Sequence, residues 1–296
     1  MAKHKQLPGL AEGIYFNLPE EVYHLDPALS HSGMVNILES PLDHWMESAA
    51  LNPDKPKYKA TDAMLFGKWC HKFLLEGMAF FEQYNVHGMR PDDKKLWISR
   101  DNWIKVHDSI QRIRGIKEGD EHFKYGYPEV SLFWRDQETG MMQRARVDYL
   151  RTFGAIDYKR LKGIGTSDIG NAIAAHGLDI QDWHYSDGIR QIRKLLRKGK
   201  IKPQGPVAED WLKAFMDEED TLFRFFFQRS TPPFIWEIVD LDQHLKESGE
   251  EWARAARAKY KANVEAHGLS QWPAGTGKVR TFELFETPRR IHDRKR

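Results

Sequence analysis

Cysteine is nearly absent from the sequence, because Cys70 is the single one among 296 residues. A disulfide within one chain is therefore excluded, and so are a zinc site of four cysteines and a cysteine-ligated iron–sulfur cluster. The sequence also has no run of about 18 apolar residues, so no membrane span is expected. Residues 1–6 lack the apolar core of a signal peptide. A reducing cytoplasm is the simplest location for such a chain.

A strong excess of one charge is also missing. The sequence has 45 lysines and arginines against 43 aspartates and glutamates, for a formal net charge of +2. Any contact with DNA must therefore come from local basic patches. The glycines at 163 and 165 match neither the phosphate-loop pattern nor the spacing of a dinucleotide site. The length allows one large domain or two small ones, and a hydrophobic content of 41% fits a globular protein.

What the sequence does contain is a polar hairpin, predicted at residues 143–150 and 155–159. Because side chains alternate along a strand, Arg144, Arg146 and Asp148 share one face of the first strand, and Asp157 and Lys159 share one face of the second. Gly154 suits a tight turn between the strands. A two-residue loop would put Asp148 directly opposite Asp157, with β-carbons about 4.5–5.5 Å apart.

Two carboxylates at that spacing repel each other unless a positive charge lies between them. A divalent cation such as Mg²⁺ takes carboxylate oxygens and fits this position. Lys159 could then orient or deprotonate a metal-bound water, or stabilise charge on a phosphate. The alternative is a solvated hairpin in which Arg144 or Arg146 neutralises Asp148, since a D-x-K motif is short. Metal-dependent phosphodiester hydrolysis is thus a hypothesis that the rest of the sequence must support.

Two flanking elements offer further ligands. A helical pattern over residues 61–76 has its apolar stripe on one side and places His71 on a different face. His71 is either a surface or half-buried histidine, or a ligand for a metal or a phosphate. A strand predicted at 127–134 carries Glu129, which is either a third carboxylate of the site or an ordinary exposed residue.

A later helix, predicted at 180–196, has a polar and basic character. Gln181 and Tyr185 are four residues apart and therefore lie on one face. The basic stretch at 190–202 includes Lys194 and Arg197 and is either a solvated face or a track for DNA phosphates. Further helices are predicted at 33–38, 44–50, 101–116, 167–175, 211–227 and 245–267, and a further strand at 234–239.

These motifs, in this order, resemble the PD-(D/E)xK nuclease superfamily, and within it the RecE-type exonuclease VIII branch of phages and prophages. The matching segments are Tyr23–Ser30, Ala63–His71 with Glu76, Asp148, Asp157–Lys159, Gln181–Gly188 and Gln271–Pro273. The resemblance implies an α/β (α+β) fold with a restriction-endonuclease-like central mixed sheet flanked by helices. Residues 1–60 would be a lead-in with helices, 61–287 the nuclease core and 288–296 a basic tail.

The resemblance also implies roles for individual residues. His71, Asp148 and Asp157 would bind Mg²⁺ or Mn²⁺, with the carbonyl of Tyr158 and the carboxylate of Glu129 as further candidate ligands. Lys159 would position the attacking water. Gln181 and Tyr185 would contact DNA near the scissile phosphate. Lys194 and Arg197 are also candidate DNA contacts. Arg144 and Arg146 are candidates too, but they remain open between phosphate contacts and simple charge partners.

The activity implied is that of an exodeoxyribonuclease, which degrades linear double-stranded DNA from 5′ to 3′ for recombination. Its partners would be DNA ends, a single-strand annealing protein and further copies of the chain in a ring. The setting would be the cytoplasm of a bacterial host carrying a phage or prophage. The sequence departs from the family pattern in two places. Arg160-Leu161 stand where the family often has Thr-Thr, and the region 190–220 is longer and more basic than in the family pattern. The alternatives are an endonuclease on the same fold and a non-catalytic DNA-binding recombination accessory protein, against which the intact acids and lysine argue.

Overall fold

The computed structural model describes residues 9–55, 59–87 and 95–274, and all structural statements refer to these. The expected basic tail at 288–296 lies outside the described residues, as does the end of the expected core beyond residue 274. Within the described part of the chain, no helix is both long enough and apolar enough to cross a membrane.

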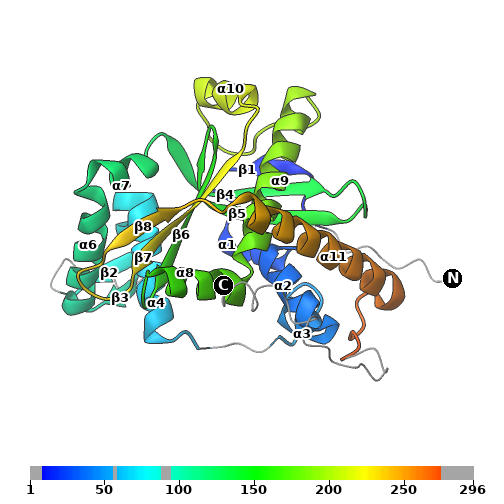
Figure 1. The fold of residues 1–296 in the computed structure, drawn as a ribbon, viewed down its shortest axis with the longest axis horizontal. Coiled ribbons are helices and arrows are strands. Elements are labelled where there is room, and N and C mark those ends of the chain that lie inside the picture. The colour runs from blue at the N-terminus through cyan, green and yellow to red at the C-terminus, as the bar shows by residue number, and fades with distance from the viewer. Residues whose placement is uncertain (1–8, 56–58, 88–94, 275–296) are drawn as a thin grey trace.

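The centre of the fold is a twisted sheet of six strands, whose ribbons cross near the middle of the molecule (Figure 1). In spatial order the strands are β1 (Gly13–Tyr15), β4 (Gly126–Arg135), β5 (Met142–Arg151), β6 (Gly154–Leu161), β7 (Leu222–Arg229) and β8 (Trp236–Val239). The β6–β7 pair is parallel, and the other neighbouring pairs of this sheet are antiparallel. The predicted mixed sheet flanked by helices is confirmed. Its edge strand β1 comes from the segment expected to be a lead-in.

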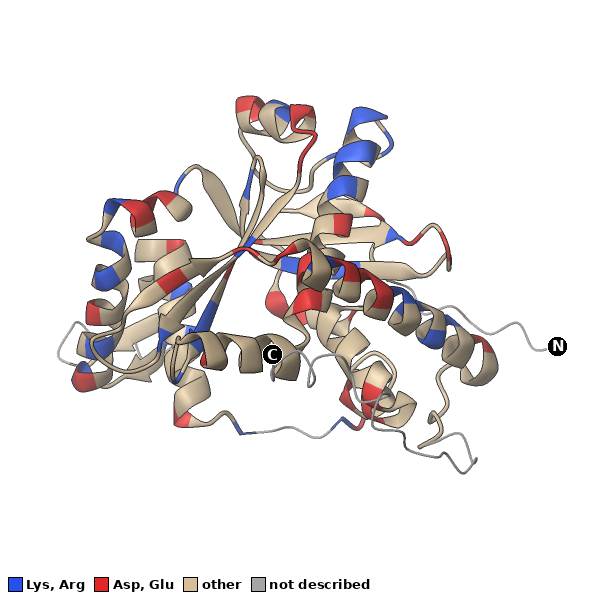
Figure 2. Ribbon diagram, viewed as in Figure 1, with Lys and Arg blue, Asp and Glu red and all other residues tan. Residues whose placement is uncertain are grey.

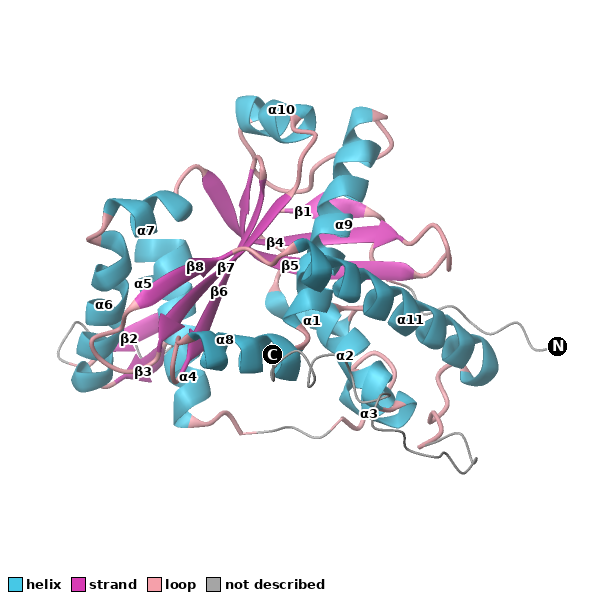
Figure 3. Cartoon of the chain, in the orientation of Figure 1, coloured by secondary structure: helices cyan, strands magenta, loops and turns pink. Residues whose placement is uncertain are grey.

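Helices cover both faces of the sheet, as the secondary-structure colouring in Figure 3 shows. Their bounds are α1 (Glu20–Leu25), α2 (His31–Glu39), α3 (Pro41–Glu47), α4 (Asp62–Glu76), α5 (Phe80–Gln83), α6 (Arg100–Arg114), α7 (Lys117–His122), α8 (Thr166–His176), α9 (Leu178–Arg197), α10 (Glu209–Asp217) and α11 (Gln243–His267). A short 3₁₀ turn at Gly77–Ala79 precedes α5, and two short parallel strands, β2 (Tyr84–Val86) and β3 (Leu96–Ile98), pair beside it.

Two cores lie on opposite faces of the sheet. Helices α8, α9 and α10 bury their apolar side chains against one face, and α4 and α6 pack against the other together with Phe123, which follows α7. A third cluster joins α2, α3 and α11 to α9, and it includes Trp272 of the Gln271–Pro273 segment. The expected nuclease core is therefore built around the strands that carry the acids.

One predicted helix is wrong in its second half. The helix expected at 211–227 ends at Asp217, and Leu222–Arg229 is the central strand β7. Phe223, Phe225 and Phe227 enter the core on one face of the sheet, whereas Phe226 enters the core on the other. A strand buried on both faces reads as a continuous apolar run, which hides its period of two.

The hairpin of β5 and β6 has the register that a two-residue loop predicts. Arg151 pairs with Gly154, Leu150 with Ala155 and Tyr149 with Ile156. Pairing stops there, so Asp148 and Asp157 are not ladder partners. Beyond this point β6 continues beside β7, where Asp157 lies opposite Phe225. The strands β5 and β6 thus form a fork, and the carboxylate of Asp148 reaches across it to accept a hydrogen bond of 2.8 Å from the backbone nitrogen of Tyr158.

Candidate metal centre

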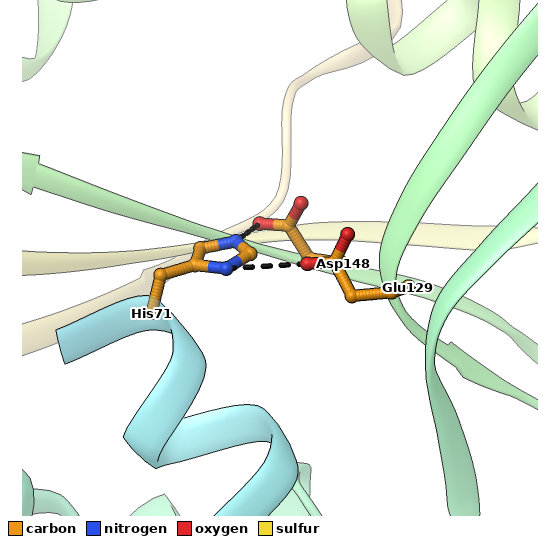
Figure 4. Close-up of side chains that lie close together, drawn as sticks. All are labelled: His71, Glu129 and Asp148. Carbon is orange, nitrogen blue, oxygen red and sulfur yellow. Dashed lines mark ion pairs between the residues drawn. The ribbon is translucent and has the colours of Figure 1, made fainter. Parts of the chain in front are cut away.

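Three side chains from three elements meet at this fork. His71 of α4 points its ring toward Glu129 of β4 and Asp148 of β5, whose carboxylates lie side by side (Figure 4). Its Nδ1 atom is 3.2 Å from Oε1 of Glu129, and its Nε2 atom is 2.9 Å from Oδ2 of Asp148. One ligand atom from each residue lies within 4.8 Å of the other two. The group therefore has the donors and the spacing of a candidate metal site.

The helix that carries His71 is defined at both ends. The hydroxyl of Thr61 caps its first turn by accepting from the backbone nitrogen of Met64 at 3.3 Å. Gly77 follows its last residue with φ of 57°, a left-handed conformation that favours glycine. Cys70, Leu74 and Leu75 are buried beneath the sheet, which turns the neighbouring His71 toward the strands.

Glu129 occupies a strained position in its strand. Its φ is 53°, in a region that costs a residue with a side chain about 1–2 kcal/mol. The β4–β5 ladder pairs Pro128 with Tyr149 and Val130 with Val147, but it skips Glu129. The register of the β4–β5 ladder is the same before and after Glu129, so no extra residue is inserted into either strand. The strained backbone is confined to the site. The second oxygen of Glu129 is held by Nε of Arg146 at 2.6 Å.

The charges of the group depend on one another. Burial alone would lower the pKa of His71, but the nearby carboxylates of Asp148, Glu129 and Asp157 raise it to about 9. Burial works against ionisation of Asp148, yet His71, Lys159 and the Tyr158 amide hold the pKa of Asp148 below its usual value. Burial raises the pKa of Glu129. A protonated His71 therefore shares the neutralisation of these acids with Arg146 and Lys159.

A second cluster lies beside the first and contains the D-x-K motif. Asp157 is 2% exposed, and its Oδ2 atom forms an ion pair of 2.6 Å with Nζ of Lys159. Its other oxygen accepts a hydrogen bond of 2.6 Å from Nε2 of Gln181. Burial, together with the charge of Asp148 and against the attraction of Lys159, raises the pKa of Asp157 to about 6. Asp157 thus belongs to the same electrostatic system as the first cluster, although its carboxylate is not among the three converging ligands.

The donor set fits a divalent cation. Two carboxylates supply the oxygen ligands that Mg²⁺ and Mn²⁺ take, and an imidazole supplies a nitrogen. A cation placed among them would replace the charge that His71 now supplies, and His71 would have to lose its proton to bind it. The set is compatible with a divalent metal and does not select one.

Several predicted site residues have other neighbours. Tyr185 is buried in the core on the α9 face, with its ring edge-on to Phe223. Arg146 pairs with Glu129, and Arg144 donates to the backbone oxygen of Tyr23 and lies over its ring. The geometry therefore makes these two arginines partners of the neighbouring acid and of α1.

Arg197 and Lys194, two basic residues near the end of α9, have different surroundings in the structure. Arg197 donates from Nη2 to the backbone oxygen of Glu218 at 2.7 Å and from Nε to that of Met216. Its guanidinium is thereby attached to the end of α10, whereas Lys194 lines an open cleft elsewhere on α9. The two residues expected to act together face different surroundings.

A supporting network behind β6 has no signal in the sequence. Arg160, one of the two residues that depart from the family pattern, donates to Oγ of Ser109 at 2.7 Å and to the hydroxyl of Tyr158 at 3.1 Å. The same hydroxyl donates to Oε1 of Gln228 at 2.6 Å. These contacts join residues up to 119 positions apart, as between Ser109 and Gln228, so no local pattern could reveal them. They fix the strand next to the D-x-K motif.

The fold has a counterpart among solved structures. A protein from Eubacterium rectale, described as a "Putative exonuclease", superimposes with a TM-score of 0.55 at 13% sequence identity. The match covers 91% of this chain and 96% of that one. At this identity the likeness establishes the fold. No protein-family model matches the chain, and no curated protein matches it.

Proposed function

We propose that this protein is a metal-dependent nuclease that hydrolyses phosphodiester bonds in DNA. The observation that carries the proposal is the convergence of His71, Glu129 and Asp148 beside the Asp157–Lys159 pair at one fork of the sheet. A structural likeness to a protein described as an exonuclease supports the same class of chemistry. Acids from adjacent strands and a neighbouring lysine are the groups that such hydrolysis requires.

The proposed division of labour takes its metal ligands from the family resemblance and the role of Lys159 from its contact with Asp157. His71, Asp148 and Asp157 would hold the metal, with Glu129 and the carbonyl of Tyr158 as additional candidates. When bound, a Mg²⁺ or Mn²⁺ ion supplies a polarised water and neutralises phosphate charge. Lys159 lies 2.6 Å from the Asp157 carboxylate, close enough to orient that water or to stabilise the developing negative charge.

The same proposal extends to the family and to the polarity of digestion. The protein would be a member of the PD-(D/E)xK superfamily, of the RecE-type exonuclease VIII branch, and would degrade linear duplex DNA from 5′ to 3′. Lys194 is its proposed DNA contact. Gln181 and Tyr185 of the same helix would lie near the scissile phosphate, with Gln181 orienting Asp157. Assembly into a ring and delivery of single strands to an annealing protein belong to this proposal.

The decisive experiment is digestion of an end-labelled linear duplex with Mg²⁺ or Mn²⁺, and with EDTA as the metal-free control. We expect metal-dependent release of label from linear DNA and no cutting of a closed circle, because an exonuclease needs an end. Cutting of the circle would instead identify an endonuclease on the same fold. Release of label that persists in EDTA would contradict a metal-dependent site.

Two variants connect the activity to the fork. Asp157→Asn should reduce digestion to background, and Lys159→Met should lower the rate by about 10²–10³-fold, as for loss of one electrostatic stabiliser. The matched control is Asp240→Asn, which removes a carboxylate from a surface ion pair with Arg224. Thermal unfolding shows whether each variant is folded. Full activity in folded Asp157→Asn would refute the assignment.

A further inference from the structure

A basic cleft lies away from the metal centre, at the far end of α9. It has a volume of about 730 Å³ and is lined by four exposed cations: Arg135, Lys194, Lys198 and Lys200. Arg135 comes from the end of β4, and the lysines come from the end of α9 and the turn after it. Figure 2 shows lysine and arginine gathered on these last turns of α9.

The turn after α9 brings the positive charge of Lys200 close to the other cations of the cleft. Gly199 has φ of 62°, and the backbone nitrogen of Lys200 donates to the carbonyl of Leu195 at 3.0 Å. This glycine-dependent turn folds Lys200 back toward the end of the helix. Favourable contact with the helix dipole would account for cations in the last turn of α9, but not for Arg135, which a different element supplies.

The acids that line the cleft have partners of their own, and Arg135 donates from Nη1 to the backbone oxygen of Gly140 at 2.7 Å. Glu12 accepts a hydrogen bond from the backbone nitrogen of Arg135 at 2.9 Å, and Asp136 is paired with the buried Arg257 at 2.8 Å. Within the described ranges of the chain, Lys194, Lys198 and Lys200 form no ion pair with a carboxylate. Their charges are therefore balanced by solvent ions, which a polyanion can displace.

We propose that this cleft binds the backbone phosphates of the DNA on which the metal centre acts, an inference that rests on the proposed function. Helix α9 connects the two places, since Gln181 contacts Asp157 and Lys194 lines the cleft. Thirteen residues at about 1.5 Å each separate them by roughly 20 Å. That span corresponds to roughly six phosphates along one strand of a duplex. The cleft is thus placed to hold backbone phosphates about six positions from the site.

The test is a salt titration of binding to a linear duplex in EDTA, where cleavage does not interfere. The triple variant K194Q/K198Q/K200Q should reduce the slope of log affinity against log salt by about 0.9 for each lysine that contacts a phosphate. The control is R100Q/K105Q/R112Q, which removes the same charge from exposed positions of α6, on the other face of the sheet. The control slope should equal that of the parent.

The outcomes separate this inference from the proposed function. An unchanged slope in the triple variant, an equal loss in the control, or a parent that does not bind DNA would each overturn the cleft assignment. If the parent cleaves DNA while the triple variant keeps the parental slope, the nuclease proposal survives and the cleft fails. If the slope falls as expected but no metal supports cleavage, the cleft stands as a DNA-binding surface and the nuclease proposal fails.

Discussion

The side-chain amide of Gln181 donates a hydrogen bond of 2.6 Å to the carboxylate of Asp157, and both residues are buried. The other amide atom of Gln181, Oε1, is also buried and has no hydrogen-bond partner among the described residues. A buried acceptor left without a donor costs about 1–3 kcal/mol, so it marks a place where a bound group or water can donate. Gln181 is therefore arranged to orient Asp157, whereas the family resemblance implies a contact with DNA.

Replacing Gln181 with alanine separates these two roles. Residues that orient a metal ligand typically change metal affinity or activity by about 10–100-fold, and we expect Gln181→Ala to raise the metal concentration needed for half-maximal digestion by that factor. Its DNA affinity in EDTA should stay close to that of the parent. The control is Gln111→Ala, an exposed glutamine on α6. Weaker DNA binding with an unchanged metal requirement would instead support the contact with DNA.

Glu129 offers a sharper test of the metal centre, because its two oxygens have different partners. Oε1 faces His71 at 3.2 Å, and Oε2 pairs with Arg146 at 2.6 Å. If Glu129 is a ligand, Glu129→Gln should weaken Mn²⁺ binding by about 10–100-fold in a calorimetric titration. Arg146→Gln removes the second contact while keeping the carboxylate, and it should affect binding less. Equal losses in both variants would mean that the ion pair, and not the ligand, is what matters.

The hairpin and its register could be predicted from the sequence because both are local. Gly154 and the alternation of side chains are sufficient to pair Tyr149 with Ile156. The separation of the strands beyond that pair has no local signal. There β6 runs on beside β7, which follows some sixty residues later and pairs with β6 at Asp157. The expected face-to-face pair of Asp148 and Asp157 is thus replaced by the fork.

A helix cap and a strained strand residue show the same contrast between local and distant causes. The hydroxyl of Ser30 accepts from the backbone nitrogen of Gly33 and caps the start of α2, a local feature of the kind that a serine before a helix indicates. The left-handed conformation of Glu129 has no such signal, because glutamate is not a residue that favours positive φ. The strained residue contacts His71 and Arg146 from distant elements, and it lies at the site that the proposal uses.

Stability at mildly acidic pH should depend on His44. This side chain is buried, stacks on Trp272 at 5.3 Å and bonds through Nδ1 with the carbonyl of Gly33 at 3.0 Å. Burial lowers the pKa of His44 to about 4, against about 6.5 in an unfolded chain. The unfolded state therefore gains a proton first as pH falls. The stabilising contribution of neutral His44 is complete above about pH 6.5 and is lost progressively toward pH 4.

The measurement is urea unfolding of the parent and of His44→Phe between pH 7.5 and 5. Asp157 and Asp182, whose pKa values burial raises to about 6, act in the opposite direction, so the difference between the two proteins is the useful quantity. This difference should change by about 2 kcal/mol over the range, at about 1.4 kcal/mol for each pKa unit. A difference that does not vary with pH would show that His44 is not held neutral.

The last prediction concerns the buried arginine that ties α11 to the sheet. Arg257 is 2% exposed and pairs with Asp136 at 2.8 Å and with Asp187 at 2.9 Å. Its Nη2 atom also lies 3.1 Å from Nδ1 of His184, whose other nitrogen meets the backbone oxygen of Arg144 at 3.0 Å. One guanidinium thus connects α11, α9 and the hairpin of β4 and β5.

Arg257→Ala should lower the free energy of unfolding by about 3–5 kcal/mol, because it leaves two carboxylates without their cation in a buried place. Arg254→Ala is the matched control, one turn earlier on the same helix. Arg254 pairs with Glu250 and Glu138 at the exposed surface, where such pairs contribute about 0–1 kcal/mol. Denaturant unfolding of both variants measures the contrast. Similar losses would mean that the Arg257 network adds little beyond a surface pair, and that packing of α11 against α9 holds this side of the fold.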